Sequence, residues 1–170
     1  MQELGELCNY NGYGQNVEDL HLHPADLARS LSPYADPFEF LNTEDIIIRL
    51  REGYKADMNH AAKAKQLKLH GKNRAFVLEN APWSRRVSGV FGNLKAREQQ
   101  ESAHAIITEN DDGSLRLSVR APLCNRRDAD TLCKKFPTGG GRAAAAGINQ
   151  LPPEKLSIFL DAFNTLYNSS

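Results

Sequence analysis

The sequence predicts an α/β protein with a layered α+β arrangement, in which helices cover a small mixed β-sheet and a long connecting helix precedes it. Three observations lead to this fold class. Two alternating apolar runs flank the turn N-D-D-G at 110–113, a pattern typical of a β-hairpin. Apolar residues recur at helical spacing over 43–69 and again over 156–167. Strand-like and helix-like segments alternate from residue 74 onward.

The first residues of the chain are expected to lack regular secondary structure, and a short helix is expected to follow them. Residues 1–16 are rich in Asn, Gly and Tyr, and this composition predicts loop or turn. The segment 23–31 predicts a short helix, because Pro24 suits the first turn, where its missing N–H costs no hydrogen bond. Two further X-Pro pairs, at 32–33 and 36–37, then interrupt the chain.

A long helix is predicted over 43–69. Asn42 or Thr43 would cap it, and Glu44 would lie in the first turn, where the helix dipole favours an acidic side chain. Gly71 follows the predicted end, as expected of the glycine that terminates many helices.

The remaining elements are each predicted from a local run of apolar residues between turn signals. They are a strand over 74–79, a helix over 82–97, hairpin strands over 103–108 and 114–120, a short helix over 128–136, and a final helix opened by Pro152-Pro153. In the second hairpin strand, alternation places Leu115, Leu117 and Val119 on one face and Arg116, Ser118 and Arg120 on the other.

Composition excludes several classes of protein. The 170 residues are 41% hydrophobic and 25% charged, which is ordinary for a globular domain. No apolar run approaches the ~18 residues that span a bilayer, and the start MQELGELCNY lacks the regions of a signal peptide. The three cysteines, Cys8, Cys124 and Cys133, form no C-x-x-C pair and are expected to be reduced thiols. We therefore expect a cytoplasmic protein without a membrane partner.

The net charge of zero conceals a strong asymmetry along the chain. Residues 1–60 hold 11 acidic and 4 basic side chains, a net charge of −7, whereas residues 61–142 hold 16 basic and 8 acidic, a net charge of +8. Such a division indicates either a basic surface that meets an anion or an acidic segment packed on a basic one. Two separately solvated faces would give the same counts.

The most informative stretch is T-G-G-G-R-A-A-A-A-G at 138–147. Three adjacent glycines cost backbone entropy, so a fold keeps them where the backbone turns sharply or approaches something closely. If 142–146 forms a short helix, the amides of Gly140, Gly141 and Arg142 lie at its N-terminus and can bind an anion. The Arg142 guanidinium would add a bidentate donor for phosphate or carboxylate. The alternative is a glycine loop that serves only packing.

Arg120 is the second candidate ligand contact. It ends its predicted strand on the same face as Ser118, and strand ends beside glycine loops are common ligand sites in layered folds. The alternative is an ordinary surface arginine. The nearby basic residues, which form either a solvated helix face or an extension of a phosphate-binding surface, are Arg126, Arg127, Lys134 and Lys135.

The alternating residues Asp19, His21 and His23 have the chemistry of a metal site. Nothing in the sequence supplies the carboxylates that usually orient metal-binding histidines. A polar loop that leads into a helix is the favoured interpretation, and a small hydrolase built on these three residues is the least favoured function.

The segment 119–151 resembles the C-terminal, DHH-associated domain of the DHH phosphoesterase superfamily, which includes RecJ-type exonucleases and nanoRNases. The likeness is carried by S-V-R at 118–120, by D-A-D-x-L at 128–132, and above all by G-G-G-R-A-A-A-A-G at 139–147. It covers about residues 70–170. In that family the residue after the glycines is most often His, whereas this chain has Arg142, which keeps a donor and adds a permanent charge.

The resemblance implies a small mixed sheet that grips a nucleotide or a short single-stranded oligonucleotide. The substrate-binding residues that it implies are Ser118, Arg120, Thr138, Gly139, Gly140, Gly141 and Arg142. It assigns no catalytic residue and no metal ligand to this chain. The basic binding surface would act with salt dependence, as phosphate-binding surfaces do.

The resemblance also implies that the catalytic half lies elsewhere. The family binds two manganese ions through D-x-D and D-H-H motifs of an N-terminal domain, and we expect both metal-binding motifs to be absent from this chain. We expect residues 1–70 to be the remnant of that domain with the connecting helix, and 71–170 to be the substrate-binding domain. No cofactor is expected in this chain, and manganese is expected in the missing domain.

Two functions from different classes follow. The first is a nucleic-acid- or nucleotide-phosphate-binding module of a DHH-family phosphoesterase, the intact protein hydrolysing phosphoester bonds in nucleotides or short oligonucleotides. Whether this chain is an enzyme by itself is left open. The second is a non-catalytic interaction module in which acidic and basic surfaces mediate self-association into a homodimer.

Overall fold

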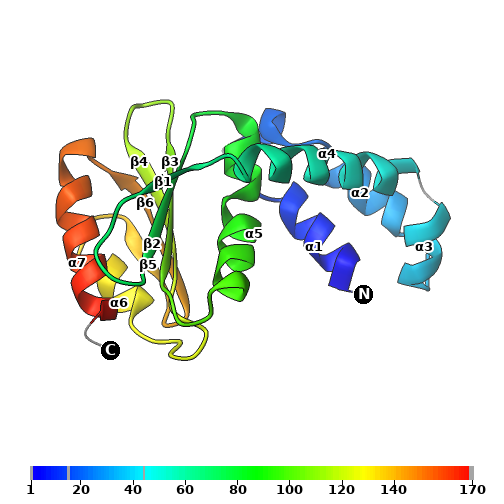
Figure 1. Ribbon diagram of the computed structural model, residues 1–170. Helices are drawn as coiled ribbons and strands as arrows, with labels where there is room; N and C mark the ends of the chain where they lie inside the picture. The colour runs from blue at the N-terminus through cyan, green and yellow to red at the C-terminus, as the bar shows by residue number, and fades with distance from the viewer. Residues whose placement is uncertain (1, 15, 44, 169–170) are drawn as a thin grey trace. The chain divides into compact units, whose positions relative to one another are not determined.

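The structure, a computed structural model, describes residues 2–14, 16–43 and 45–168 (Figure 1). It divides into two compact units. The helical unit comprises Met1–Lys63 with Ala81–Val90, and the sheet unit comprises Ala64–Asn80 with Phe91–Ser170. Across the described residues, no helix combines the length and the apolar character needed to cross a bilayer.

The helical unit is built from short helices around one apolar cluster. Its elements are α1 (Gln2–Asn11), the 3-10 helix η1 (Val17–Asp19), α2 (Pro24–Leu31), α3 (Pro37–Thr43), α4 (Asp45–Ala61) and the first half of α5 (Pro82–Glu98). The buried members of the cluster are Leu7, Leu22, Leu27, Phe40, Leu41, Ile47 and Leu50. The short helix predicted over 23–31 is confirmed as α2, with Pro24 at its start and the His23 ring accepting from the Ala25 amide.

The loop predicted over 1–16 is wrong, because α1 occupies most of that segment. Glycine and asparagine are weak helix formers, but tertiary packing overrides such a preference. Leu4, Leu7 and Cys8 form an apolar stripe on α1, and this stripe packs into the cluster of the helical unit beside α4. The burial of that stripe is the physical reason for the helix.

The single helix predicted over 43–69 is also wrong. Asn42 lies inside α3 rather than at a cap, and α4 ends at Ala61. The predicted capping by the Thr43 side chain and the first-turn position of Glu44 lie outside the described residues. Beyond α4 the chain becomes strand β1 (Lys65–Leu67), because pairing with β2 provides a ladder of backbone hydrogen bonds.

The sheet unit contains one six-stranded mixed sheet in the order β1-β2-β3-β4-β6-β5. The remaining strands are β2 (Arg74–Leu78), β3 (His104–Glu109), β4 (Leu115–Arg120), β5 (Gly139–Arg142) and β6 (Ala145–Leu151). Only β2 and β3 pair in parallel, and α5 makes the connection between them. The predicted mixed sheet and the predicted β3–β4 hairpin are confirmed, and Gly113 takes a positive φ of 79° in the hairpin turn.

Helices lie on both faces of this sheet (Figure 1). On one face are α6 (Ala129–Cys133) and α7 (Leu156–Asn168), the latter preceded by the 3-10 helix η2 (Pro153–Lys155). Their core includes Ala105, Ile107, Leu117, Val119, Ile148, Phe159, Phe163 and Tyr167. On the opposite face lies the second half of α5, where the Phe91 ring packs edge-on against Phe76. The predicted alternation in β4 therefore holds, and Ser118 and Arg120 lie on the face away from that core.

Candidate anion-binding site

A cavity of about 340 Å³ opens in the sheet unit between the second half of α5 and the end of β4. Three of the described residues around it are arginines and none is a carboxylate, so its wall carries a formal charge of +3. The lining residues are Asn93, Ala96, Arg97, Arg120, Ala121, Leu123, Arg126, Ala144 and Ala145. A wall of this charge attracts anions.

The Arg120 side chain is held in place by hydrogen bonds from two directions. Its Nε donates to Asn93 Oδ1 on α5 over 2.7 Å, and its Nη1 donates to Ser118 Oγ over 2.9 Å and to the Val119 carbonyl over 3.1 Å. α5 packs against this side chain at Gly92, where an added Cβ would lie at the ordinary contact distance of 3.6 Å from Arg120 Cγ. A guanidinium oriented in this way is arranged in advance for a planar or tetrahedral oxyanion.

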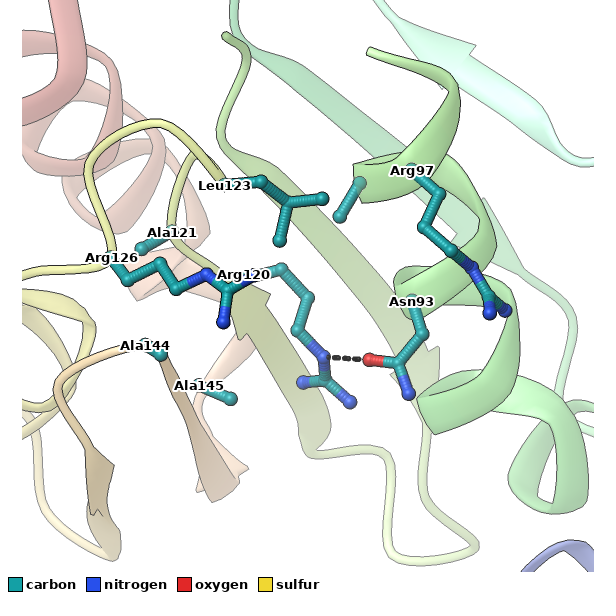
Figure 2. Close-up of a pocket in the computed structure, with 9 residues that line it drawn as sticks. Asn93, Arg97, Arg120, Ala121, Leu123, Arg126, Ala144 and Ala145 are labelled. Atoms are coloured by element: carbon teal, nitrogen blue, oxygen red, sulfur yellow. Dashed lines mark hydrogen bonds between the residues drawn. The ribbon is translucent and has the colours of Figure 1, made fainter. Parts of the chain in front are cut away.

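Figure 2 shows Arg120 between two further arginines, with Arg97 on α5 to one side and Arg126 on the loop to the other. Ala144 and Ala145 line the cavity close to Arg120 and Arg126. Their small side chains leave room at this end of the cavity. The guanidinium groups of Arg120 and Arg126 offer donors for phosphate oxygens, and Arg97 adds a positive charge on the α5 side of the cavity.

No helix forms over 142–146, so the anion site that a helix there would have provided at its N-terminus is absent from these described residues. The glycine run forms β5, which turns directly into β6 with Arg142 paired to Ala145. Gly141 adopts a φ of 140°, a conformation that L side chains rarely take. Gly139 lies against the last residue of α6, so that a Cβ there would overlap the Cys133 carbonyl oxygen. Local backbone geometry therefore requires two of the three glycines.

Gly140 differs from its two neighbours. An added Cβ would meet nothing within 4 Å, and its φ lies outside the positive region. Within the described residues, neither packing nor backbone conformation explains why this position is glycine. Gly140 lies on the edge strand of the sheet and is partly exposed.

The structure brings together some of the predicted binding residues and separates others. Ser118 and Arg120 meet through their hydrogen bond at the cavity. Thr138 instead supports the hairpin: at a φ of 62°, its Oγ1 accepts from the Gln150 amide over 2.9 Å and donates to the Gln150 carbonyl over 3.2 Å. Arg142 is exposed and does not line the cavity.

Sequence reasoning missed Asn93 and Arg97. They lie four residues apart on α5, so they share one face of the helix. The four-residue spacing could be read from the sequence. Whether that helix face lines a cavity depends on which strand the helix covers, and the sequence does not give this. Arg126 was predicted as either a solvated residue or part of a phosphate-binding surface, and it lines the cavity.

The polar residues Asp19, His21 and His23 do not converge on a metal site. Asp19 forms a bidentate ion pair with Arg85, at 2.7 and 2.8 Å. The His21 ring is hydrogen-bonded to the Tyr10 hydroxyl over 2.7 Å. His23 caps α2. Each of the three therefore has a structural contact within the helical unit.

A buried network in the helical unit centres on Asp57. Its carboxylate accepts hydrogen bonds from the Tyr10 hydroxyl and from Arg86, whose Nε and Nη2 lie 2.7 and 3.1 Å away. Burial alone would raise the pKa of Asp57, but the bonds from Arg86 and Tyr10 outweigh burial and lower it. Burial, reinforced by the positive charge of Arg86, lowers the pKa of His21. The network thus holds an ionised Asp57 and a neutral His21.

The described residues do not fit the two manganese ions of the DHH phosphoesterases. They include no group of three or more His, Cys, Asp or Glu side chains arranged to hold a metal ion. One D-x-D spacing does occur in the chain, at Asp128 and Asp130, so the motif is not strictly absent from the sequence. Asp130 forms an ion pair with Lys134 over 2.7 Å.

Comparisons with known proteins show a shared fold but no similarity in sequence that would assign a family. No protein-family model matches the sequence, and no curated protein matches it. Among solved structures, a pGpG-specific phosphodiesterase, PggH from Vibrio cholerae, superposes with a TM-score of 0.58 at 16% identity, over 87% of this chain and 52% of that one. An exopolyphosphatase-related protein from Bacteroides fragilis gives 0.54 at 16% identity, over 84% of this chain and 43% of that one.

The chain therefore spans about half the length of these structures or less. The layered fold that the resemblance to DHH phosphoesterases implied is confirmed, since both neighbours share it across most of the described residues. At this identity the likeness is one of fold. The chain has the fold of part of a pGpG-specific phosphodiesterase and of part of an exopolyphosphatase-related protein.

Proposed function

We propose that the sheet unit binds the phosphate groups of nucleotides or short single-stranded oligonucleotides, as the substrate-binding domain of a DHH-family phosphoesterase. The observation that carries this proposal is the cavity at Arg120, whose described lining includes three arginines and no carboxylate. A phosphate is the ligand best matched to several converging guanidinium groups.

Two further observations support the assignment. The fold is shared with proteins named as a phosphodiesterase and as exopolyphosphatase-related. Two of the residues that carry the resemblance to the DHH-associated domain, Ser118 and Arg120, are hydrogen-bonded to each other, and Arg120 lines the cavity. We propose that the glycine run at 139–141 approaches the same ligand through its backbone, with Gly140 as the open position.

The intact protein would hydrolyse phosphoester bonds, with its manganese-binding residues in a domain outside this chain. Under this proposal residues 1–70 continue from that catalytic domain and 71–170 form the binding domain. The described residues offer no metal-binding group, so this chain would bind the ligand without turning it over. The chain's own contribution is to hold the phosphate and orient the ligand.

Binding can be measured by fluorescence anisotropy with a labelled, 5′-phosphorylated dinucleotide. We expect binding that weakens as salt rises. The Arg120→Ala variant should raise Kd at least about tenfold, since it removes charge-assisted hydrogen bonds. Arg116→Ala is the matched control, because Arg116 lies on the same face of β4 but does not line the cavity. Equal affinity in wild type and Arg120→Ala would refute the site.

Two further measurements separate the remaining possibilities. Arg142→Ala should weaken binding if the glycine hairpin reaches the ligand, and it should leave Kd unchanged if the hairpin serves packing alone. Added manganese should give no hydrolysis of the dinucleotide above background; turnover would show that the catalytic residues are within this chain. Light scattering at low and high salt tests the rival function, for which mass would respond to salt while nucleotides had no effect.

A further inference from the structure

A second polar cavity, of about 170 Å³, opens in the sheet unit where β1 and β2 meet the end of α5. It shares no lining residue with the Arg120 cavity. Its wall combines two cations, one carboxylate, two amides, one aromatic ring and one imidazole. These residues are Gln66, Arg74, Phe76, Lys95, Glu98, Gln99 and His104. The space holds several waters or one tetrahedral oxyanion.

His104 is the unusual member of this wall. The residue is only 1% exposed, and neither ring nitrogen has a hydrogen-bond partner among the described residues. Burial and the positive charge of Arg74 lower the pKa of His104 to about 4, against a smaller opposing effect of the Ser102 backbone. At neutral pH the ring is therefore uncharged, with one N–H donor and one acceptor nitrogen.

A buried imidazole without partners is costly. Leaving a polar group desolvated and unpaired destabilises a fold by about 1–3 kcal/mol. Folds usually retain such a group only where water, an ion or a ligand supplies the missing hydrogen bond. His104 lines the polar cavity, but both ring nitrogens are almost inaccessible, so a ligand in the cavity reaches them only when neighbouring side chains shift.

The two cations at the cavity define the charge of that partner. Arg74 on β2 is the register partner of His104 on the parallel strand β3. Its Nε donates a hydrogen bond to the Gln99 side chain. Lys95 lies over the Phe76 ring, 5.7 Å from its centroid, and pairs with Glu98 over 2.8 Å. With Glu98 included, the described wall keeps a net charge of +1 and favours an anion.

We propose that this cavity is a second phosphate-binding site, in which Arg74 and Lys95 supply positive charge and His104 supplies the buried hydrogen bond. A phosphate group suits a neutral imidazole better than a carboxylate does. At neutral pH part of the phosphate carries a hydroxyl, so it both donates and accepts, whereas an ionised carboxylate only accepts. The source is either free phosphate or the phosphate of a nucleotide.

The test is thermal unfolding of the full chain with inorganic phosphate, adenosine monophosphate or acetate, each against chloride at equal ionic strength. A ligand that binds only the folded state raises the Tm as its concentration passes Kd. We expect inorganic phosphate, adenosine monophosphate or both to raise the Tm. Acetate should have little effect. A rise with inorganic phosphate identifies the free ion as a sufficient ligand, and a rise with the nucleotide alone identifies an organic phosphate.

Variants locate the binding. Arg74→Gln and His104→Leu should each raise the Kd for phosphate at least about tenfold. His104→Leu removes an unpaired buried polar group, so its fold should survive. Lys72→Gln is the matched control, since Lys72 is exposed, carries the same charge and lies outside the cavity lining. Repeating the titration in Arg120→Ala separates this site from the proposed function, because Arg120 lines the first cavity and not the second.

A direct readout is the side-chain nitrogen resonances of His104 in an NMR titration. Phosphate should shift both resonances at the concentrations that raise the Tm. The proposal fails if no phosphate compound raises the Tm of the wild type, if acetate raises it equally, or if Arg74→Gln responds as the wild type does.

Discussion

Two polar clusters in this chain, each containing arginine and histidine, differ in whether the histidine ring has a hydrogen-bond partner. In the helical unit, Asp57 accepts from Tyr10 and from both nitrogens of Arg86, and His21 bonds the same tyrosine. In the sheet unit, His104 lies between Arg74 and Arg120 on three adjacent strands, and neither ring nitrogen has a partner among the described residues.

The comparison separates structural charges from charges available for binding. Buried groups that satisfy one another hold a fold in one arrangement, and removal of one partner leaves the other charge uncompensated. Groups that line a cavity with a net positive charge are placed where an anionic ligand can bind. Side-chain type alone therefore does not identify a binding arginine. What distinguishes a candidate binding arginine is a position on the wall of a cavity with a net positive charge, as at Arg120 and Arg74.

The largest expected effect comes from breaking the satisfied cluster. Asp57→Ala should lower the free energy of unfolding by about 3–5 kcal/mol, because Arg86 would remain buried without a counter-charge. Urea denaturation measures this loss.

The matched control is an exposed ion pair of the same chemistry. Glu3→Ala removes the partner of Arg51 and should cost less than about 1 kcal/mol, since solvent screens that pair. If Asp57→Ala and Glu3→Ala lowered the free energy of unfolding equally, burial of the Asp57 network would not increase the cost of removing a partner.

The unsatisfied cluster should give a pH dependence. The folded pKa of His104 is about 4 and its ordinary value is 6.5, so between these values the unfolded chain binds more protons than the folded one. Stability should therefore be full above pH 6.5 and should fall by about 3 kcal/mol as pH drops toward 4, measured without phosphate.

His104→Leu should abolish that component of the pH dependence in urea denaturation. His70→Gln, which removes an exposed imidazole, is the matched control. If His104→Leu retained the wild-type slope between pH 4 and 6.5, the buried ring would not be the group that titrates.

A smaller effect tests the glycine hairpin beside the first cavity. Gly139→Ala should destabilise the chain by about 1–3 kcal/mol, because its Cβ would overlap the Cys133 carbonyl and the backbone must shift. Gly140→Ala should leave the free energy of unfolding unchanged within about 0.5 kcal/mol, since its Cβ meets open space. Under the proposed function, Gly140→Ala should nevertheless weaken dinucleotide binding. Thermal unfolding and anisotropy on the same two variants measure both effects.

Elements with strong local signals could be predicted from the sequence. The β3–β4 hairpin follows from its turn and its alternation, and the helix α7 follows from its apolar stripe. The alternation in β4 also correctly placed Ser118 and Arg120 on one face. These features depend on a few neighbouring residues, so no tertiary information was needed.

Elements decided by tertiary pairing could not be predicted in this way. The four alanines after Arg142 favour a helix by propensity, but pairing with β4 places Ala145 and Ala146 in strand β6, and the two before them form the turn from β5. Gly147 illustrates the reason, because a Cβ there would lie 2.6 Å from the Leu117 carbonyl. Likewise, Asn93 and Arg97 join the cavity only because α5 covers the end of β4.

The two edge strands of the sheet affect how the protein can be handled in solution. The two edge strands are short, with three residues in β1 and four in β5. Edge strands can template the addition of further chains, and brevity is one way in which native sheets suppress this. Concentrated solutions should therefore resist fibril growth through the sheet, which favours the millimolar samples that NMR titrations require.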